Sequence, residues 1–511
     1  MAIRGLPGRL TFIVSLAILW ISLVAPAVLH SQVSSPSSET VTIDLGAPSH
    51  PFPHYWERTF GSGRAVLSLR DSYRRDLREV KQATGFEYVR FHGILLDEVG
   101  LYSEDSPGNP VYNFSYVDQI YDGLLANGVR PYVELSFMPQ ALRSTDVTQA
   151  FWYKPYVSPP KSWQRWDGLI EQLARHLVER YGLSEVAQWY FEVWNEPNLD
   201  FWAGNPRQET YFELYDHTVR ALKRASPLLR VGGPATAQAA WVAAFIDHCV
   251  GNNVPADFVS THVYANDRSE DVFGKHEEIS RRDMVCDAVK MVHDQVKASA
   301  RPDLPIEWSE YNASYMNEPD VTDSLFMGPW LANTIRACDG LVDSLAYWTF
   351  SDVFEEQGVV RQPFYGGFGL LAAYDLPKPS FNAFKLLHAL GTRRIPVDSD
   401  SVLATVRADG SLAIAVWNYS PPDQPGPSEQ VTLEFKGIRG KQAAFVARLD
   451  ADHGSLLATY KKMGSPKYPT AQQQWELRQA AQLPAPGIVP LESGRVTITL
   501  PPYGLAIIET R

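Results

Sequence analysis

The chain has 511 residues, a formal net charge of −12, 45% hydrophobic residues and 20% charged residues. This balance is typical of a globular protein with one large and one smaller domain, and it excludes a disordered chain. No run of Lys or Arg could follow a phosphate backbone, so a nucleic acid is not an expected partner. Because Cys249, Cys286 and Cys338 form no CxxC pair, we expect no metal site, although one disulfide is possible.

Residues 1–31 have the features of a targeting segment. Arg4 and Arg9 precede an apolar stretch at residues 10–29, and an Ala-Pro-Ala sequence within it could be a cleavage site. The stretch is also long enough to remain as a membrane anchor, but two serines and a proline interrupt it and favour a cleaved signal. We therefore expect export to the periplasm or the medium, with a membrane contact only if the segment is retained. Residues 32–40 are rich in Ser and Pro and predict a linker.

Between residues 71 and 391, helical patterns alternate with short apolar strands. We expect helices at 71–84, 116–126, 162–181, 209–225, 239–250, 280–298, 323–337 and 379–390, and strands at 88–92, 131–135, 189–194, 230–233, 258–264, 306–310 and 345–350. Such alternation predicts a parallel sheet with both faces covered, and a closed (β/α)8 TIM barrel fits it better than an open sheet. No GxGxxG or GxxxxGK[ST] motif follows an early strand, so no nucleotide cofactor is expected.

The pattern changes on either side of the expected barrel. After residue 392, strand patterns at 412–419, 430–435, 443–449, 496–500 and 505–510 are separated by Pro, Gly and Asp. This texture predicts a smaller C-terminal antiparallel β-sandwich at residues 392–511. We expect residues 41–70 to hold N-terminal strand structure that could join this sandwich.

A glutamate ends one of the expected strands in a distinctive context. Glu196 stands in the sequence Trp-Asn-Glu-Pro, directly after an apolar strand. Strand alternation would place Glu192, Trp194 and Glu196 on one face, with Pro197 ending the strand. Asn195 offers donors and acceptors for a sugar hydroxyl. A lone strand-end glutamate usually forms only a salt bridge, but this context favours catalysis, because barrel active sites lie where strands end.

A second strand ends in Glu310. It follows an apolar strand start and is flanked by Tyr311, whose hydroxyl could hydrogen-bond the carboxylate. Glu307 competes for the role, but a period of two turns it away from the face shared by Trp308 and Glu310. Cleaving a glycosidic bond needs one carboxyl group that gives a proton and a second that attacks carbon or activates water. Glu196 and Glu310 would supply this pair.

These motifs resemble the clan of retaining barrel glycosidases whose acid/base and nucleophile end the fourth and seventh strands. Within the clan the chain is similar to glycoside hydrolase family 39, the family of β-xylosidases and α-L-iduronidases. The resemblance covers residues 56–390 and extends more loosely into the sandwich. Its matching segments are Gly-Ser-Gly-Arg-Ala at 61–65, Arg-Phe-His-Gly at 90–93, Trp-Asn-Glu-Pro-Asn at 194–198, Thr-His-Val-Tyr at 261–264 and Trp-Thr-Phe-Ser-Asp at 348–352.

The resemblance implies a role for each matching residue. Glu196 would be the general acid/base and Glu310 the nucleophile, with Asn195 beside them. The implied substrate-binding residues are Arg90 and His92 after the first strand, His262 and Tyr264 after the sixth, Trp348 on the eighth, and Glu355 seven positions later, with Glu356 adjacent to it. The residues alone leave other interpretations open: Arg90 could be a structural cation, the two histidines could be core residues, and Trp348 could serve packing.

The expected function is hydrolysis of O-glycosides by double displacement. This mechanism needs carboxyl groups about 5–5.5 Å apart, against ~6.5–9.5 Å for inversion. The expected partner is an oligosaccharide or polysaccharide; a β-D-xyloside is the first choice, and an α-L-iduronidase-like or other specificity of the family is the alternative. A uronic acid would need extra cations near the pocket. An inactive carbohydrate-binding barrel or a matrix structural protein are the alternatives from other classes, and both strand-end glutamates argue against them. The sequence does not indicate the oligomeric state.

Overall fold

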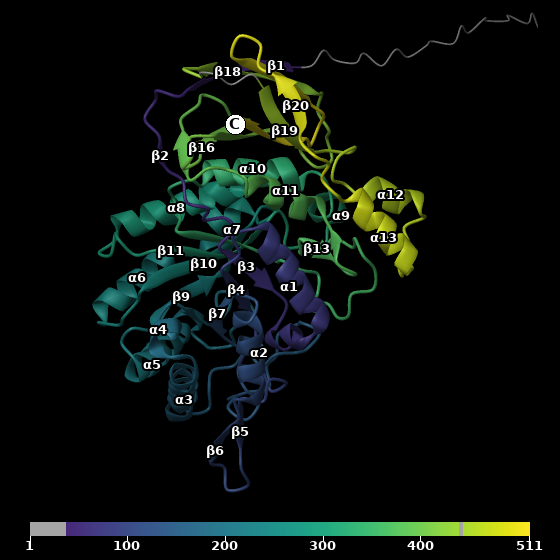
Figure 1. Ribbon diagram of the computed structural model, residues 1–511. Coiled ribbons are helices and arrows are strands. Elements are labelled where there is room, and N and C mark those ends of the chain that lie inside the picture. The colour runs from purple at the N-terminus through teal and green to yellow at the C-terminus, as the bar shows by residue number, and fades with distance from the viewer. Residues whose placement is uncertain (1–36, 439–442, 511) are drawn as a thin grey trace, which may run out of the picture. The chain divides into compact units, whose positions relative to one another are not determined.

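The computed structural model describes residues 37–438 and 443–510 (Figure 1). The expected signal or anchor at residues 1–31 lies outside the described residues. The linker expected at 32–40 ends earlier than predicted, because residues from 37 onward already belong to strand β1 (Ser37–Asp44). No helix in the described part of the chain is both long enough and apolar enough to cross a membrane.

Eight parallel strands form a closed barrel, which confirms the predicted fold. In chain order these strands are β3 (Thr59–Ser62), β4 (Tyr88–Phe91), β7 (Arg130–Leu135), β8 (Tyr190–Val193), β9 (Arg230–Thr236), β10 (Phe258–Tyr264), β11 (Ile306–Asn312) and β12 (Ser344–Tyr347). The helices that follow them in turn are α1 (Asp71–Ala83), α2 (Ser115–Leu125), α3 (Trp163–Tyr181), α5 (Arg207–Ala225), α6 (Val242–Gly251), α8 (Met284–Ala298), α10 (Met327–Ala337) and α11 (Pro379–Leu387), and they surround the strands in Figure 1.

Helix α3 illustrates why these segments are helical. Its buried apolar residues recur at the spacing of one helix face and include Trp166, Leu169, Ile170 and Leu173. The helix begins where the Ser162 side chain accepts a hydrogen bond from a backbone N–H of the first turn, and a glycine follows its last residue. Strand β11 is buried at every position, as a strand covered on both faces must be.

The barrel begins earlier than predicted. Strand β3 is its first strand, so the boundary expected at residue 71 is wrong and part of the 41–70 segment belongs to the barrel. Counted from β3, Glu196 follows the fourth strand and Glu310 lies on the seventh, as predicted, whereas Arg90 belongs to the second strand and not the first. Gly61 in β3 has no room for a side chain, because a Cβ atom there would lie 2.0 Å from the Trp348 ring.

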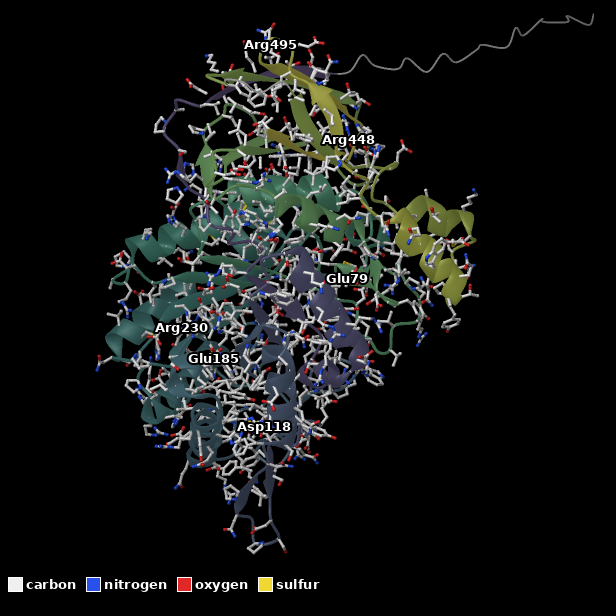
Figure 2. The ribbon with its side chains drawn as sticks, viewed as in Figure 1. Glu79, Asp118, Glu185, Arg230, Arg448 and Arg495 are labelled. Carbon is white, nitrogen blue, oxygen red and sulfur yellow. A yellow bond between two sulfur atoms is a disulfide. The ribbon has the colours of Figure 1, made fainter. Side chains whose placement is uncertain are left out.

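Aromatic residues fill the amino-terminal half of the barrel interior. Tyr88, Tyr132, Tyr190 and Phe258 form one buried cluster, in which the rings of Tyr132 and Tyr190 stack with centroids 5.1 Å apart. Charged residues lie near the start of two barrel strands: Arg230 is the first residue of β9, and Glu185 precedes β8 by a few residues; both are labelled in Figure 2. These side chains therefore fill the amino-terminal end of the barrel, so we expect an active site at the carboxyl-terminal end.

The second region consists of two sheets that share an apolar core. One has seven strands in the order β2-β15-β16-β17-β22-β19-β20, and the other has three in the order β1-β18-β21, so that β1 joins the sandwich as a strand parallel to β18. The bounds are β2 (His50–Pro51), β15 (Arg393–Ile395), β16 (Val402–Val406), β17 (Leu412–Trp417), β18 (Glu429–Lys436), β19 (Ala443–Leu449), β20 (Gly487–Pro490), β21 (Arg495–Leu500) and β22 (Leu505–Thr510).

Smaller elements complete the described chain. Two helices inserted into the sandwich were not predicted: α12 (Leu457–Lys462) and α13 (Ala471–Ala480). The others are β5 (Tyr102–Glu104), β6 (Pro110–Tyr112), α4 (Leu183–Val186), α7 (Ser269–Phe273), α9 (Pro319–Thr322), β13 (Leu371–Ala372), β14 (Leu376–Pro377) and two short 3-10 helices, Ala65–Leu69 and Ala237–Ala239. Helices α10 and α11 pack against strands of the seven-stranded sheet, so the sandwich rests on the outside of the barrel.

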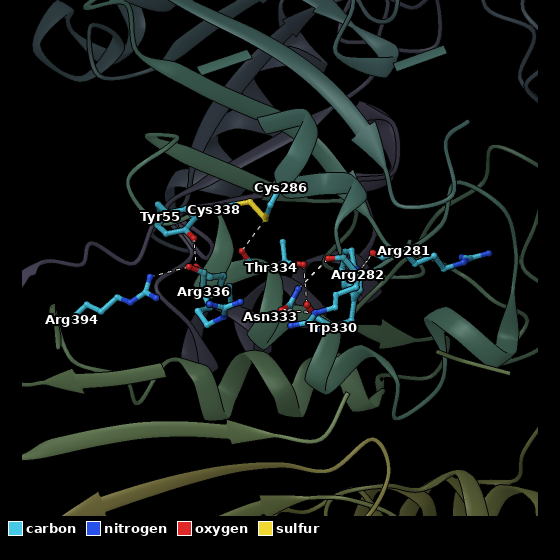
Figure 3. The surroundings of a disulfide bond; sticks show 11 residues. Tyr55, Arg281, Arg282, Cys286, Trp330, Asn333, Thr334, Arg336, Cys338 and Arg394 are labelled. Atoms are coloured by element: carbon cyan, nitrogen blue, oxygen red, sulfur yellow. Dashed lines mark hydrogen bonds between the residues drawn. A yellow bond between two sulfur atoms is a disulfide. The ribbon is translucent and has the colours of Figure 1, made fainter. Parts of the chain in front are cut away.

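Two of the three cysteines form a disulfide, and the third is a buried free thiol. Cys286 of α8 is bonded to Cys338 at the end of α10, with the Cα atoms 5.3 Å apart. Figure 3 shows the bond beside Thr334, in a region where the Tyr55 hydroxyl donates a hydrogen bond to the last turn of α10. The disulfide thus ties two neighbouring barrel helices together, while Cys249 stays reduced.

Candidate active site

Glu196 lies in a tight turn just beyond β8. The strand ends at Val193, and both Trp194 and Glu196 have positive φ angles, 73° and 46°. The predicted alternation therefore stops at Val193, and the expectation that Glu192, Trp194 and Glu196 share one face is wrong. Glu192 accepts a hydrogen bond inside the barrel, the Trp194 indole donates to the Phe201 carbonyl at 2.7 Å, and Glu196 faces a pocket.

Glu310 points into the barrel because of an irregularity in β11. The pairing with β10 steps from Trp308 directly to Glu310, which leaves Ser309 as an extra residue. The bulge breaks the period of two, so the expectation that Glu307 faces away from Glu310 is wrong. Both glutamates lie inside the barrel, but at different levels along its axis. Glu307 is near Tyr190, in the aromatic cluster at the amino-terminal end.

The two carboxyl groups face one another at close range. One oxygen of Glu196, one oxygen of Glu310 and a ring nitrogen of His262 all lie within 4.8 Å of one another. His262 Nδ1 is 3.1 Å from Glu196 Oε1 and 3.7 Å from Glu310 Oε1. Burial, Arg90 and His92 hold the pKa of His262 well below its usual range, so this ring is neutral. This close approach of the two carboxyl groups fits the spacing of a retaining pair better than that of an inverting one.

Arg90 holds the carboxylate of Glu310 in place. Its side chain is fully buried and donates to Glu310 Oε1 at 2.6 Å, to Glu192 Oε2 at 2.6 Å and to Asn195 Oδ1 at 2.9 Å. It also lies 2.8 Å from Glu134 Oε2. Arg90 is not among the residues that line the pocket, so the structure places it with the carboxylates it orients. This matches the structural-cation alternative more closely than direct sugar binding.

The pocket at the carboxyl-terminal end of the barrel has a volume of about 380 Å³, which is within the range of small-ligand sites. Its lining contains six residues predicted from the sequence: His92, Asn195, Glu196, Tyr264, Glu310 and Trp348. Glu356, which the sequence offered beside Glu355, also lines it, and the lining residues that the sequence did not indicate are Phe151, Leu199, Phe201, Ala237, Gln238, Asp267, Tyr315, Gln357 and Phe368. Most of these lie on loops, where neither strand period nor motif spacing gives a signal.

Of the two adjacent acids after β12 between which the sequence could not decide, Glu356 lines the pocket and Glu355 does not. Glu355 binds Arg64 at 3.0 Å and Arg70 at 2.6 Å and does not line the pocket. Glu356 lines it, with its Oε1 3.4 Å from His92 Nε2. Burial favours a neutral His92, but nearby carboxylates, Glu134 foremost, raise the pKa of His92 to about 10. His92 is therefore a cation held between acidic groups.

The two facing carboxyl groups of the pocket, on Glu196 and Glu310, have unequal environments. Burial, followed by the charge of Glu310, raises the pKa of Glu196 well above its usual range. Burial also raises the pKa of Glu310, but Arg90, His92 and the Tyr264 hydroxyl act against it. Tyr264 Oη donates to Glu310 Oε2 at 2.6 Å. The shared proton therefore belongs on Glu196, and Glu310 is the ionised member.

Two groups of described residues bring three possible metal ligands within 4.8 Å: Glu196 with His262 and Glu310, and His54 with Glu57 and His388. In the second group both histidine rings are hydrogen-bonded to the Glu57 carboxylate, at 2.6 and 2.8 Å. In the first group, Arg90 and His92 already supply positive charge to Glu310. In both groups the carboxylates therefore already have protein partners, which explains why these side chains lie close together.

Two carboxyl groups that face each other across one pocket, at the carboxyl-terminal end of a parallel eight-stranded barrel, are the arrangement that glycosidases use. The chain belongs to glycosyl hydrolases family 39, whose family model matches residues 39–495. It is 39% identical to a β-xylosidase of Geobacillus stearothermophilus over 433 residues, 82% of this chain and 85% of that protein. It is 38% identical to a β-xylosidase of Caldicellulosiruptor saccharolyticus over 454 residues, 87% and 91% of the two chains.

The fold agrees with that of a solved relative. The crystal structure of a monomeric β-xylosidase from Caulobacter crescentus matches with a TM-score of 0.84 and 34% identity, covering 93% of this chain and 99% of that one. The prediction of family 39 is therefore confirmed, and the protein is a glycoside hydrolase.

Proposed function

We propose that this glycoside hydrolase is a retaining β-D-xylosidase that cleaves xylo-oligosaccharides. The observation that carries the proposal is the pair formed by Glu196 and Glu310, whose oxygens lie within 4.8 Å of each other in one pocket. The similarity to β-xylosidases along most of the chain supports the choice of sugar.

In the first step, Glu310 attacks the anomeric carbon while Glu196 gives its proton to the leaving oxygen. Attack needs an ionised carboxylate, and Arg90 and Tyr264 each donate a hydrogen bond that favours this form of Glu310. Proton donation needs a carboxyl that is still protonated near neutral pH, which the raised pKa of Glu196 supplies.

In the second step, Glu196 acts as a base. Once Glu310 carries the glycosyl group it has lost its negative charge, so one cause of the raised pKa of Glu196 disappears. The ionised Glu196 then takes a proton from water, which attacks the same carbon and releases the sugar with its original configuration.

The charges around the pocket favour a neutral sugar over a uronic acid. Four carboxyl groups line the pocket, on Glu196, Asp267, Glu310 and Glu356, and none of its lining residues is Lys or Arg. The one cation in the lining, His92, is already engaged by carboxylates. A uronate would gain no partner of its own and would face like charges, which argues against the iduronidase alternative.

Initial rates on aryl glycosides test the proposal. We expect 4-nitrophenyl β-D-xyloside to be hydrolysed with a kcat/KM far above that for an aryl α-L-iduronide, and NMR to show β-xylose as the first product. Release of α-xylose first would contradict retention, and a preference for the iduronide would contradict the choice of sugar.

We also propose that the protein is exported. The charged start and the apolar stretch at residues 10–29 support this, and so does the disulfide, because such bonds persist mainly outside the cytosol. Mass spectrometry of the protein from periplasm and medium should find a chain that lacks about the first 30 residues. An uncleaved chain confined to the cytoplasm would contradict the proposal.

A further inference from the structure

The pocket has two sides, and the barrel order distinguishes them. Glu196 follows β8 and Glu310 lies on β11, with β9 and β10 between them on one side and β12, β3, β4 and β7 on the other. The second side carries His92, Trp348 and Glu356, next to the Glu310 carboxylate that attacks the sugar. The first side carries a separate group of polar residues that the two-step mechanism does not use.

That group is built by the segment after β9. Four non-glycine residues at the end of β9 and in the segment that follows it, Ala235, Gln238, Ala239 and Trp241, have φ angles between 53° and 63°. Strained backbone of this kind persists only where its surroundings fix it, and it clusters at functional sites. Its side chains and backbone are therefore held in a defined place.

Hydrogen bonds fix this segment to the acid/base turn. The Glu196 N–H donates to the Ala235 carbonyl at 2.7 Å. The Asn198 side chain forms two bonds with Ala237, accepting from its N–H at 2.9 Å and donating to its carbonyl at 3.0 Å. Gln238, the next residue, thus has a fixed position relative to the proton donor.

Asp267 stands next to Gln238 in the pocket wall. It follows β10, and its carboxylate accepts the Tyr264 N–H at 2.7 Å and a hydrogen bond from the Gln238 side chain. Among the described residues no Lys, Arg or His forms an ion pair with Asp267. Its charge is close enough to Glu196 to contribute to the raised pKa of that acid. The pair therefore offers amide and carboxylate groups to a ligand beside the proton donor.

Apolar surfaces flank this polar pair. Leu199 and Phe201 line the pocket after the acid/base turn, and Tyr315, half exposed at the rim, has its ring 6.1 Å from that of Tyr264 in an edge-to-face arrangement. A sugar ring presents hydroxyls at its edge and C–H groups on its faces. Two hydrogen-bonding side chains between apolar walls match that shape.

We propose that Gln238 and Asp267 form a leaving-group subsite, which binds the hydroxyls of the sugar released in the first step. The leaving oxygen takes its proton from Glu196, so the released sugar must lie on the side of the pocket where these residues stand. The subsite makes the enzyme selective for a sugar as leaving group, and it receives sugar acceptors during the second step. This inference rests on the proposed β-D-xylosidase function.

The test compares xylobiose, whose leaving group has hydroxyls, with 4-nitrophenyl β-D-xyloside, whose leaving group has none. Gln238→Ala should lower kcat/KM for xylobiose by roughly 3- to 10-fold, and Asp267→Asn by roughly 10- to 100-fold, the effects of one neutral and one charged hydrogen bond. Gln238→Ala should stay within about twofold of the wild type on the aryl xyloside, a difference too small for a lost hydrogen bond. Asp267→Asn also removes a charge that acts on Glu196, so it should lose some activity on the aryl xyloside, but much less than on xylobiose. Asp271→Asn, an exposed residue of α7, is the matched control and should leave both substrates unaffected.

A second measurement tests the subsite in the second step alone, by following the reactivation of a trapped glycosyl-enzyme. A glycosyl-enzyme formed with a 2-deoxy-2-fluoro-β-D-xyloside should regain activity faster when xylobiose is added as acceptor, and Gln238→Ala should lose this acceleration. Equal losses on both substrates, or unchanged hydrolysis of xylobiose, would overturn the subsite. If the wild type cleaves neither xyloside, the proposed function fails; the same comparison on the disaccharide that it does cleave then decides the subsite.

Discussion

Tyr264→Phe removes one hydroxyl from the active site and leaves the ring in place. Tyr264 Oη donates to Glu310 Oε2 at 2.6 Å, while Arg90 binds the other oxygen, Oε1. The variant therefore takes away a hydrogen bond to a buried carboxylate without removing its counter-ion. This makes it a selective probe of the charge on Glu310.

The size of the effect follows from the kind of bond. A hydrogen bond to a charged group contributes about 1.5–3 kcal/mol, and one pKa unit corresponds to about 1.4 kcal/mol. The bond favours the ionised form, so its loss should raise the pKa of Glu310 further. The second step regenerates the carboxylate and should slow about tenfold or more for the same reason.

The pH profile of kcat/KM on 4-nitrophenyl β-D-xyloside measures this shift. Activity is lost as pH falls through the pKa of Glu310, so the acid limb should move to higher pH in the variant. The alkaline limb, set by Glu196, should move much less. Tyr116→Phe, an exposed tyrosine of α2, is the control. An unmoved acid limb, or one displaced to lower pH, would refute this assignment of charge.

Three further predictions concern the acid, the floor of the barrel and the disulfide. Glu196→Gln should lose the alkaline limb and most activity on xylobiose, while 2,4-dinitrophenyl β-D-xyloside still reacts in the first step; a persisting alkaline limb would contradict the acid role. Burial raises the pKa of Glu307 to about 7, so the stability that it contributes is present below ~4.3 and lost as pH rises through 7. Glu307→Gln should therefore flatten the decline in unfolding free energy between pH 5 and 8, measured by urea unfolding, and an unchanged decline would exclude this cause. Replacing Cys286 and Cys338 together by Ala should lower the unfolding free energy by about 4 kcal/mol, since the bond closes a loop with a sequence separation of 52 residues; a loss below about 1 kcal/mol would show that the loop argument fails.

The barrel and both glutamates could be predicted because their signals are local. Apolar strands such as β10 and β11 are buried along their whole length and contrast with the amphipathic helices around them. The first strand, β3, was not predicted as part of the barrel because its four residues, Thr-Phe-Gly-Ser, contain only one large apolar side chain. Helices α12 and α13 were not predicted because each has one buried residue, Tyr460 and Leu477 respectively. One apolar position per helix is too few to produce a helical period.

The details of the site depend on backbone irregularities that a regular period cannot represent. The turn at Trp194 and Glu196 and the bulge at Ser309 each break strand alternation where a catalytic residue must be aimed. Glu355 and Glu356 are identical in type and adjacent, and only the course of their loop decides that one binds arginines while the other reaches His92. The sequence indicates the candidate residues, and the course of the loops decides which of them meet in the pocket.

Covalent trapping tests the central claim most directly. Incubation with 2,4-dinitrophenyl 2-deoxy-2-fluoro-β-D-xyloside should slow the second step and leave the sugar attached to the enzyme, and peptide mass spectrometry should locate it on Glu310. A label on Glu196, Glu307 or Glu356, or inactivation without any attached sugar, would contradict the account of a retaining pair in which Glu310 attacks and Glu196 moves the proton.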